Sequence, residues 1–175
     1  MKIGKVFPDA CIPVCFSANN DFIGYTAVMI RSVLDHASPD YNYDIIILYT
    51  DITEERRKKV LSLAAGMPNV SIRFADISAY ISSLTFFTES VYTGTKYTNE
   101  AYYRLLIPSL MSDYEKVIYL DGDMIALTDL AALYETDMNG YMLASSRDFG
   151  GICNCYIEGD PRRAYREGEL GIRNI

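Results

Sequence analysis

The most informative residues for chemistry are Asp121, Gly122 and Asp123, which directly follow the apolar run 116–120 (KVIYL). An unbroken apolar run of this length predicts a buried strand, and in open α/β sheets ligands gather at the carboxyl ends of such strands. Two carboxylates held close together repel each other and lose hydration, so a neutralising cation is expected. Carboxylate oxygens suit Mg²⁺ or Mn²⁺, which keep positions for water and substrate phosphates. Gly122 is expected to let the backbone approach the ligand.

Two other interpretations of this tripeptide stay open at this point. Asp and Gly are common turn residues, and a D-x-D pattern alone is weakly specific, so a plain surface turn also fits. A phosphatase of the haloacid dehalogenase type also carries D-x-D after an apolar strand, with the first Asp attacking phosphorus. In that class the motif opens the domain, and Thr or Val follows the second Asp by two positions. Here Ile125 holds that position and a full α/β unit precedes the motif, which disfavours the phosphatase.

The elements that would position the tripeptide alternate between strands and helices. The run 12–18 (IPVCFSA) predicts a strand that ends in the polar cluster Asn19-Asn20-Asp21. A helix is expected from Phe22, capped by Asp21 and ended by Ser38-Pro39. Further strands are predicted at 43–49 and 70–74, with a helix between them that Thr53 caps and that ends at Gly66-Met67-Pro68.

The second half of the chain continues this pattern less regularly. Residues 77–98 are expected to form a loop-rich excursion, and 101–106 a helix that Pro108 ends. After the tripeptide come an apolar run at 124–127, a helix capped by Thr128 or Asp129, and a strand at 141–144. Alternating buried strands and amphipathic helices predict an α/β fold with parallel strands and right-handed crossovers.

Composition excludes several classes of protein. The 175 residues carry 16 Lys and Arg against 23 Asp and Glu, a net charge of −7, and half of them are hydrophobic. This much apolar surface is inconsistent with wholesale disorder. The acidic balance disfavours nonspecific binding to nucleic acid, because the only cationic run, 56–59, follows two glutamates on an expected helix and fits a solvated helix face. Pro8, Asp9 and Pro13 stand where a signal peptide would need an unbroken apolar stretch, and no later run is long enough to span a bilayer, so a cytoplasmic protein is expected.

The cysteines and the single histidine add little chemistry. Cys11 and Cys15 lie in one place and Cys153 and Cys155 in another, which matches neither paired CxxC zinc sites nor a dense disulfide framework. Cys15 is expected to be buried in its strand. Cys153 and Cys155 share one side of an extended segment, which leaves a metal or redox role open, with ordinary thiols favoured. His36 is interpreted as a helix-end residue.

The order and spacing of the motifs resemble glycosyltransferase family 8. The resemblance runs from residue 12 to about 175 and rests on F-S-A-N-N-D-F at 16–22, Y-Y-R-L at 102–105, Y-L-D-G-D-M at 119–124, L-T-D-L-x-x-L-Y at 127–134 and A-S-S-R-D at 144–148. Members of this family are retaining enzymes with a GT-A fold, a Rossmann-like, mostly parallel sheet with flanking helices. They use UDP-sugars and Mn²⁺.

The resemblance implies a role for particular side chains. Asp121 and Asp123 match the metal-binding pair, with Gly122 between them in the cofactor site. The loop that holds uridine is matched by Ser17, Ala18, Asn19, Asp21 and Phe22, with the Phe22 ring at the position that stacks on uracil. Arg104 matches an arginine that reaches the donor sugar or phosphate, and Asp148 an acidic residue near the sugars. Without the motif order, Phe22 fits a core aromatic, Arg104 a surface ion pair and Asp148 a turn.

The implied activity is transfer of a hexose from UDP-glucose or UDP-galactose to a carbohydrate or glycolipid acceptor, as in lipopolysaccharide biosynthesis. The family's later motifs include an Asn-containing strand and a segment that supplies a His together with Gly, Lys and Trp. This sequence has no Trp, and its only His is His36. We therefore expect one GT-A-like domain over 1–175, with a short lead at 1–11, that lacks its C-terminal part and the third metal ligand. Such a domain would expose apolar surface and self-associate. A non-catalytic UDP-binding module, and peripheral attachment of a full-length form to the inner face of the membrane, stay open as alternatives.

Overall fold

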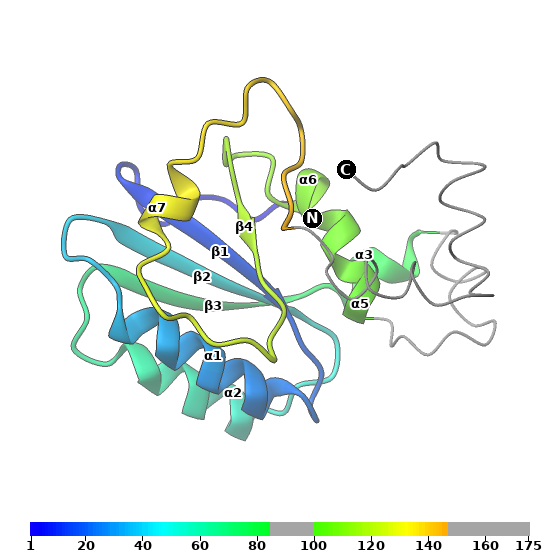
Figure 1. Ribbon diagram of the computed structural model, residues 1–175. Coiled ribbons are helices and arrows are strands. Elements are labelled where there is room, and N and C mark those ends of the chain that lie inside the picture. Colours follow the sequence, from blue (N-terminus) through cyan, green and yellow to red (C-terminus); the bar gives the residue numbers. More distant parts are fainter. Residues whose placement is uncertain (85–99, 147–175) are drawn as a thin grey trace, which may run out of the picture. The chain divides into compact units, whose positions relative to one another are not determined.

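The computed structural model of this chain describes residues 1–84 and 100–146 (Figure 1). The chain divides into two compact units, Met1–Thr136 and Asp137–Ile175. The expectation of a single domain over 1–175 stays a prediction. No helix in the described ranges is long and apolar enough to cross a membrane.

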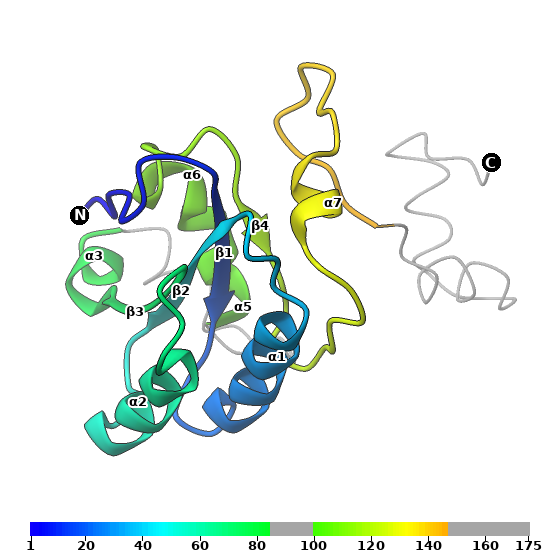
Figure 2. The same cartoon turned by 90° about the vertical axis from the view of Figure 1, so that its left-hand side faces the viewer.

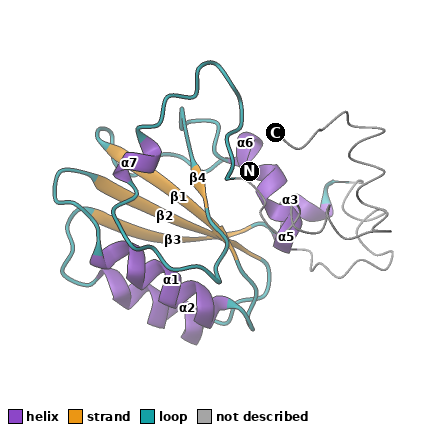
Figure 3. Cartoon of the chain, viewed as in Figure 1, coloured by secondary structure: helices purple, strands orange, loops and turns teal. Residues whose placement is uncertain are grey.

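A four-stranded parallel sheet forms the centre of the first unit (Figure 3). In the order β3-β2-β1-β4 its strands are Val70–Asp76, Asn42–Tyr49, Cys11–Ser17 and Ile118–Tyr119. The register places Val14 of β1 opposite Ile45 of β2 on one side and opposite Ile118 of β4 on the other. The predicted α/β fold with parallel strands is therefore confirmed.

Helices cover both faces of this sheet (Figure 2). Two longer helices, α1 (Ile23–Asp35) and α2 (Glu54–Leu61), pack on one face, and α2 continues into a 3₁₀ turn at Ser62–Ala64. The described residues of this unit also form shorter helices: α3 (Ser78–Ser82), α5 (Glu100–Tyr103), α6 (Ile107–Leu110) and α7 (Ala131–Tyr134), with a 3₁₀ turn at Arg104–Leu106 between α5 and α6.

The alternation of side chains along β1 and β2 builds two cores. Val14 and Ile45 face the core beneath α1, whereas Cys15 and Ile46 face the core that includes Leu110 of α6. All four side chains are completely buried. Burial on both faces explains why these strands have unbroken apolar sequences rather than alternating ones, and it confirms the prediction for Cys15.

Two predicted helix boundaries are wrong, for local reasons. Asp21 does not cap α1, because the side-chain oxygen of Asn19 accepts hydrogen bonds from the backbone N–H groups of Asp21 and Phe22. Pro108 does not end a helix either, since it lies in the first turn of α6. Proline is tolerated there because the first N–H groups of a helix have no partner within it.

The predicted helix after the tripeptide exists as α7, and Asp129 rather than Thr128 bonds its first turn. The Asp129 carboxylate accepts hydrogen bonds from the Ala131 N–H at 3.0 Å and the Tyr43 hydroxyl at 2.6 Å. His36 lies at the C-cap of α1, as predicted.

Two predicted strands differ from the structure. The run 116–120 forms only the two-residue β4, because just these residues pair with β1. In the second unit, 141–144 is not a strand, and Met142 is 98% exposed. Apolar residues form strands only where a partner strand and a core receive them, which sequence periodicity alone does not report.

Candidate functional site

Most of the predicted site residues lie at or just after the carboxyl ends of β1 and β4, which are neighbours in the sheet. From β1 the chain moves outward to β2 and β3, then returns past β1 to form β4. This reversal of direction is a topological switch point, where open α/β sheets bind ligands. We call the group that gathers here the carboxyl-edge site: Ser17, Ala18, Asn19, Asp21, Phe22, Arg104, Asp121, Gly122 and Asp123.

Direct contacts hold the two chain segments together. The Ser17 and Tyr119 hydroxyls lie 2.8 Å apart in a hydrogen bond, and the Leu120 N–H donates to the Cys15 carbonyl at 3.1 Å. The apolar Ala18 beside Ser17 is buried and anchors the start of the loop in the core. The side chain of Ser17 and the backbone entering Asp121 are thereby fixed relative to one another.

Gly122 has a steric role that the sequence did not reveal. A Cβ atom built on it would lie 2.3 Å from the Thr26 hydroxyl oxygen and 3.4 Å from the Thr26 Cα. Thr26 is buried in α1, and its hydroxyl donates to the Phe22 carbonyl. Glycine is thus required because the loop after β4 lies directly against α1, a different reason from the predicted approach of a ligand.

The loop between β1 and α1 is held from two sides. Asn19 closes a turn onto Asp21 and Phe22 at 3.0 and 2.9 Å, and its own carbonyl accepts the Ile23 N–H. The Asn20 N–H donates to the Asp51 carboxylate at 3.2 Å, which ties the loop to the segment after β2. Both oxygens of Asn19, in the side-chain amide and in the main chain, therefore already accept hydrogen bonds, while the Asp21 side chain is exposed to solvent.

Phe22 presents an aromatic ring at this edge of the sheet. The side chain is 51% exposed, and its centroid lies 5.8 Å from that of Tyr25 with an interplanar angle of 47°. The alternative of a core aromatic is therefore wrong. An exposed ring beside a second exposed ring offers a stacking surface for a planar ligand.

Arg104 is placed by three contacts. Its guanidinium donates to the Asp121 carboxylate at 3.0 Å and to the Ala101 carbonyl at 2.8 Å, and it lies 4.7 Å from the centroid of the Tyr119 ring. The alternative of a surface ion pair is thus present in the structure, but the partner is one of the two predicted metal ligands. The arginine belongs to the same site as the tripeptide.

Tyr119 is a site residue that the sequence analysis missed. Its ring supports Arg104 and its hydroxyl bonds Ser17, so one side chain links the ends of β1 and β4 to the segment after α5. Burial raises the pKa of Tyr119, so the phenol is neutral at pH 7. A usable signal was present, since alternation along a strand places residues i and i+2 on the same side and Tyr119 precedes Asp121 by two positions.

The two carboxylates suit a hard cation. Both residues are exposed, and no described residue bonds the Asp123 carboxylate. Two carboxylates is the usual protein contribution to a Mg²⁺ or Mn²⁺ site completed by water and phosphate oxygens. Within 1–84 and 100–146, no third His, Cys, Asp or Glu joins them in a metal-binding group.

Asp148 belongs to the predicted site but lies outside the described residues, as do Cys153 and Cys155. The structure therefore brings together the predicted residues from the first unit, and the role of Asp148 stays a prediction.

Comparison with known proteins gives consistent matches. The model of glycosyl transferase family 8 matches residues 13–170. Glycosyltransferase GlyF of Streptococcus pneumoniae serotype 4 is 30% identical over 77% of this chain and 31% of its own length. General stress protein A of Bacillus subtilis is 24% identical over 81% of this chain and 48% of its own length. The chain thus spans less than half of these two relatives.

Solved structures match the fold as well. The apo structure of the bifunctional glycosyltransferase WbbM matches 99% of this chain and 30% of its own, with a TM-score of 0.83 and 26% identity. The Q189E variant of LgtC matches 85% of this chain and 49% of its own, with a TM-score of 0.67 and 26% identity. The arrangement of strands and helices is that of the GT-A glycosyltransferases.

Proposed function

Because the chain belongs to glycosyltransferase family 8, we propose that the carboxyl-edge site binds a UDP-sugar and transfers its hexose, with retained anomeric configuration, to a carbohydrate or glycolipid hydroxyl. UDP-glucose and UDP-galactose are the proposed donors. The observation that carries the proposal is the meeting of an exposed aromatic ring, a carboxylate pair and an arginine at one topological switch point. Each suits a different part of such a donor.

The loop after β1 would hold the nucleoside. The Phe22 ring stacks on uracil, and Asn19 and Ser17 keep the loop in place through their bonds to the start of α1 and to Tyr119. Asp121 and Asp123 would hold Mn²⁺ or Mg²⁺ at the diphosphate. When bound, this cation supplies Lewis-acid stabilisation of the departing UDP.

Arg104 would carry positive charge to the same region. In the structure its partner is the Asp121 carboxylate, which a cation would also claim. Stacking on Tyr119 and the bond to the Ala101 carbonyl keep the guanidinium in place when that carboxylate turns to another partner. The released N–H groups can then donate to a phosphate or sugar oxygen, a geometry that a planar guanidinium provides and an ammonium does not.

The difficult step is loss of UDP from the anomeric carbon through an oxocarbenium-like state. Charge develops on the leaving diphosphate, so preorganised donors at that position lower the barrier more than donors that bind all states equally. We place Arg104 in this role and Asp148 near the sugar, where a carboxylate can accept hydrogen bonds from its hydroxyls.

Calorimetric titration of UDP in Mn²⁺ and in EDTA tests the binding site. The proposal expects clearly tighter binding with Mn²⁺, and equal affinity in both buffers would remove the metal from it. Incubation with UDP-glucose and UDP-galactose, followed by NMR of the anomeric proton, then tests turnover and retention. Tight UDP binding without any sugar transfer would favour a non-catalytic nucleotide-binding module.

Variants at Arg104 and Tyr119 test how the arginine works. Arg104→Lys is expected to reduce turnover more than UDP affinity, because the guanidinium acts on the departing diphosphate. Tyr119→Leu removes the stacking ring and should act in the same direction, whereas Tyr119→Phe keeps the ring and serves as its matched control. Equal losses of turnover and UDP affinity in Arg104→Lys would mean that the arginine stabilises the bound substrate and the transition state equally.

A further inference from the structure

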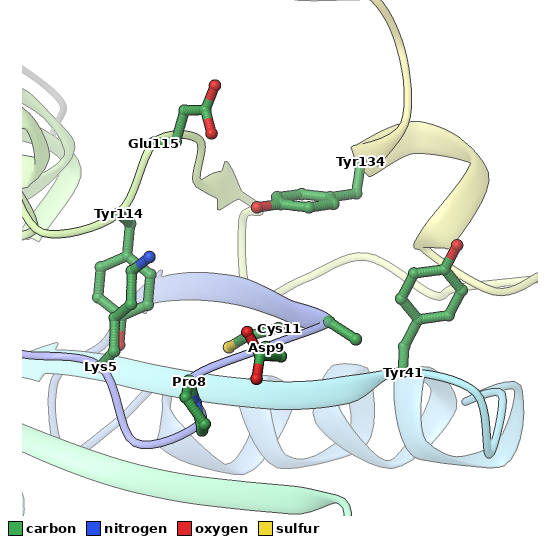
Figure 4. Close-up of a pocket in the computed structure, with 9 residues that line it drawn as sticks. Lys5, Pro8, Asp9, Cys11, Tyr41, Tyr114, Glu115 and Tyr134 are labelled. Atoms are coloured by element: carbon green, nitrogen blue, oxygen red, sulfur yellow. The ribbon is translucent and has the colours of Figure 1, made fainter.

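A second candidate site lies at the opposite edge of the sheet, where the strands begin. A cavity of about 280 Å³ opens there, between the segment before β1, the segments leading into β2 and β4, and α7 (Figure 4). Its walls include three tyrosines, Tyr41, Tyr114 and Tyr134, and its charged side chains are Lys5, Asp9 and Glu115. We call it the amino-edge pocket.

We propose that the amino-edge pocket binds a neutral carbohydrate, one sugar ring of a glycan, at a site separate from the donor site. The volume is near the lower end of the roughly 300–1,000 Å³ range of ligand pockets, so it suits a ligand of about one ring. All of its lining residues belong to the first unit of the chain.

The walls and the rim offer the two kinds of contact that a sugar ring needs. Tyr41 and Tyr134 are half-buried, so part of each aromatic ring is available to the C–H face of a pyranose. The carboxylates of Asp9 and Glu115 are exposed and, like the Tyr134 hydroxyl, make no hydrogen bond to any described residue. Free acceptors and a free hydroxyl around aromatic walls match the hydroxyl groups at the edge of such a ring.

Other ligand classes fit less well. The ammonium of Lys5 already lies 5.9 Å from the Tyr114 ring centroid and that of Lys116 lies 5.2 Å from the Tyr134 ring centroid, so an organic cation would meet positive charge at both rings. An anion would meet Asp9 and Glu115. A purely apolar ligand would leave both carboxylates desolvated and unpaired, which costs free energy. A neutral polyol avoids all three penalties.

The floor of the pocket is uncharged as well. Cys11, at the start of β1, is half-buried, and burial together with the nearby Asp44 raises the pKa of its thiol to about 11. The thiol is therefore neutral at pH 7 and adds no charge beneath the ligand.

The segment that forms one wall is firmly attached to the sheet. The Ile3 N–H donates to the Leu110 carbonyl at 2.7 Å, and the Gly4 carbonyl accepts a hydrogen bond from the Arg73 guanidinium at 3.0 Å. Further along, the Asn42 side chain donates to the Asp9 carbonyl at 3.0 Å. These contacts hold Lys5 and Asp9 at the pocket.

The family match does not account for this pocket. It begins at residue 13, so Lys5, Asp9 and Cys11 all precede the matched segment. The pocket thus combines residues before the matched segment with Tyr41, Tyr114, Glu115 and Tyr134 inside it, and the proposal for it does not depend on the proposed transfer reaction.

NMR titration of the ¹⁵N-labelled protein with neutral sugars tests the proposal directly. Glucose, galactose, N-acetylglucosamine and cellobiose are added first to the free protein and then to protein saturated with UDP and Mn²⁺. We expect shifts at Cys11, Glu115 and Tyr134 with a Kd of about 1–10 mM, since a ligand of this size supplies little binding free energy. The shifts should be the same with UDP present.

Variants assign the binding to the pocket. Glu115→Ala should weaken sugar binding about tenfold, because a charged acceptor for hydroxyl groups is lost, and it leaves the fold intact since this carboxylate bonds no described residue. Tyr134→Phe keeps the ring and should cost about threefold through the lost hydroxyl. Glu54→Ala, at an exposed carboxylate on α2 that pairs with Lys58, is the control and should bind as the parent does.

Several outcomes would overturn the proposal. These are the absence of shifts at the highest sugar concentration, shifts at Phe22 and Asp121 that UDP abolishes, or an equal effect of Glu54→Ala and Glu115→Ala. Tighter binding of tetramethylammonium or inorganic phosphate than of any sugar would assign the pocket to a charged ligand. None of these outcomes bears on Mn²⁺-dependent UDP binding, which is measured separately.

Discussion

Carboxylates at the two edges of the sheet differ in burial and in hydrogen bonding. Toward the amino edge, the completely buried Asp44 receives two hydrogen bonds from Arg73, at 3.0 and 2.7 Å, and one from the Tyr114 hydroxyl. At the carboxyl edge, Asp121 and Asp123 are exposed; Arg104 bonds Asp121, and no described residue bonds the Asp123 carboxylate. A buried charge must be fully paired to be tolerated, whereas an exposed pair left largely unsatisfied is free to bind a ligand. The difference separates structural charge from candidate functional charge.

At the amino edge, Tyr114 has both a structural role and a place in the candidate pocket. Tyr114 donates its hydroxyl proton to Asp44 and accepts a hydrogen bond from Arg73 at 2.9 Å, while its ring forms part of the pocket wall. Burial is the main reason that the pKa of Tyr114 is raised, so the phenol donates to the carboxylate throughout the neutral range. The network that stabilises β2 and β3 thus also shapes the proposed sugar pocket.

Removing the buried charge should have the largest effect on stability. Asp44→Ala leaves Arg73 and Tyr114 without their shared acceptor, and we expect a loss of about 3 kcal/mol in the free energy of unfolding, at the low end for a broken buried pair because Arg73 is 29% exposed. Urea unfolding measures this loss. The exposed pair Lys2–Asp113 is the control, since Asp113→Ala should cost less than about 1 kcal/mol. Similar losses in the two variants would contradict the distinction between the edges.

The next largest effect is expected from steric contact at the carboxyl edge. Gly122→Ala places a Cβ 2.3 Å from the Thr26 hydroxyl, so α1 or the loop must shift, at about 1–3 kcal/mol. The same shift should displace Asp121 and Asp123 and weaken Mn²⁺-dependent UDP binding. Thermal unfolding and calorimetry measure the two effects.

A second variant shows whether the contact with Thr26 is the cause. In the double variant Gly122→Ala with Thr26→Ala, the clashing hydroxyl is gone. The double variant should therefore lose less stability than the sum of the losses in the two single variants. Gly24→Ala is the control, since nothing lies within 4 Å of the added Cβ and alanine is favoured over glycine in a helix. Purely additive losses in the double variant would exclude a steric cause.

These two edges also show what a sequence can and cannot predict. The apolar runs of β1 and β2 were visible because burial on both faces makes a strand largely apolar. That the residues after β1 and β4 meet follows from a parallel sheet and the family resemblance. The support of Arg104 by Tyr119 and the contact of Gly122 with Thr26 depend on side-chain packing between distant segments. No periodicity encodes such packing.

The amino-edge pocket could not be predicted from the sequence. Lys5 and Asp9 are separated from Glu115 and Tyr134 by more than half of the chain, and only the pairing of β4 beside β1 brings them together. The carboxylates there form no motif, because their spacing is set by tertiary structure. A motif search finds chemistry that a single loop carries, such as Asp121 and Asp123, and misses chemistry assembled from four segments.

Asp123→Asn should separate binding from stability at the carboxyl edge. Loss of one of the two proposed cation ligands should weaken UDP binding in Mn²⁺ about tenfold or more, since even the loss of a group that only hydrogen-bonds a metal ligand costs roughly 10–100-fold in metal affinity. The melting temperature without metal should stay the same or rise, because repulsion from Asp121 is relieved. Calorimetry and thermal unfolding on the same samples give both values. An unfolded variant would instead identify Asp123 as part of a structural turn.

The smallest expected effect comes from Asp76, a carboxylate at the carboxyl edge that already has partners. At the end of β3, its Oδ1 accepts hydrogen bonds from the Ser78 hydroxyl at 2.6 Å and the Ser78 N–H at 2.9 Å, and these bonds lower the pKa of Asp76. A lowered pKa in the folded state stabilises the protein above the ordinary Asp range, and this contribution disappears as pH falls through the folded pKa. Asp76→Asn should therefore cost about 0.5 kcal/mol at pH 7, small because the side chain is exposed, and close to nothing near pH 3.

Urea unfolding of the parent and of Asp76→Asn at pH 7, 5 and 3 measures this closing difference, with the exposed Asp40→Asn as the matched control. A difference that stays constant with pH would mean that the Asp76 charge contributes nothing. If the difference in unfolding free energy disappears toward pH 3 as expected, a carboxylate at the carboxyl edge can have a structural role, so position alone does not identify a ligand-binding carboxylate. What distinguishes Asp123 is that no described group bonds its carboxylate, whereas Ser78 bonds Asp76 as Arg73 bonds Asp44.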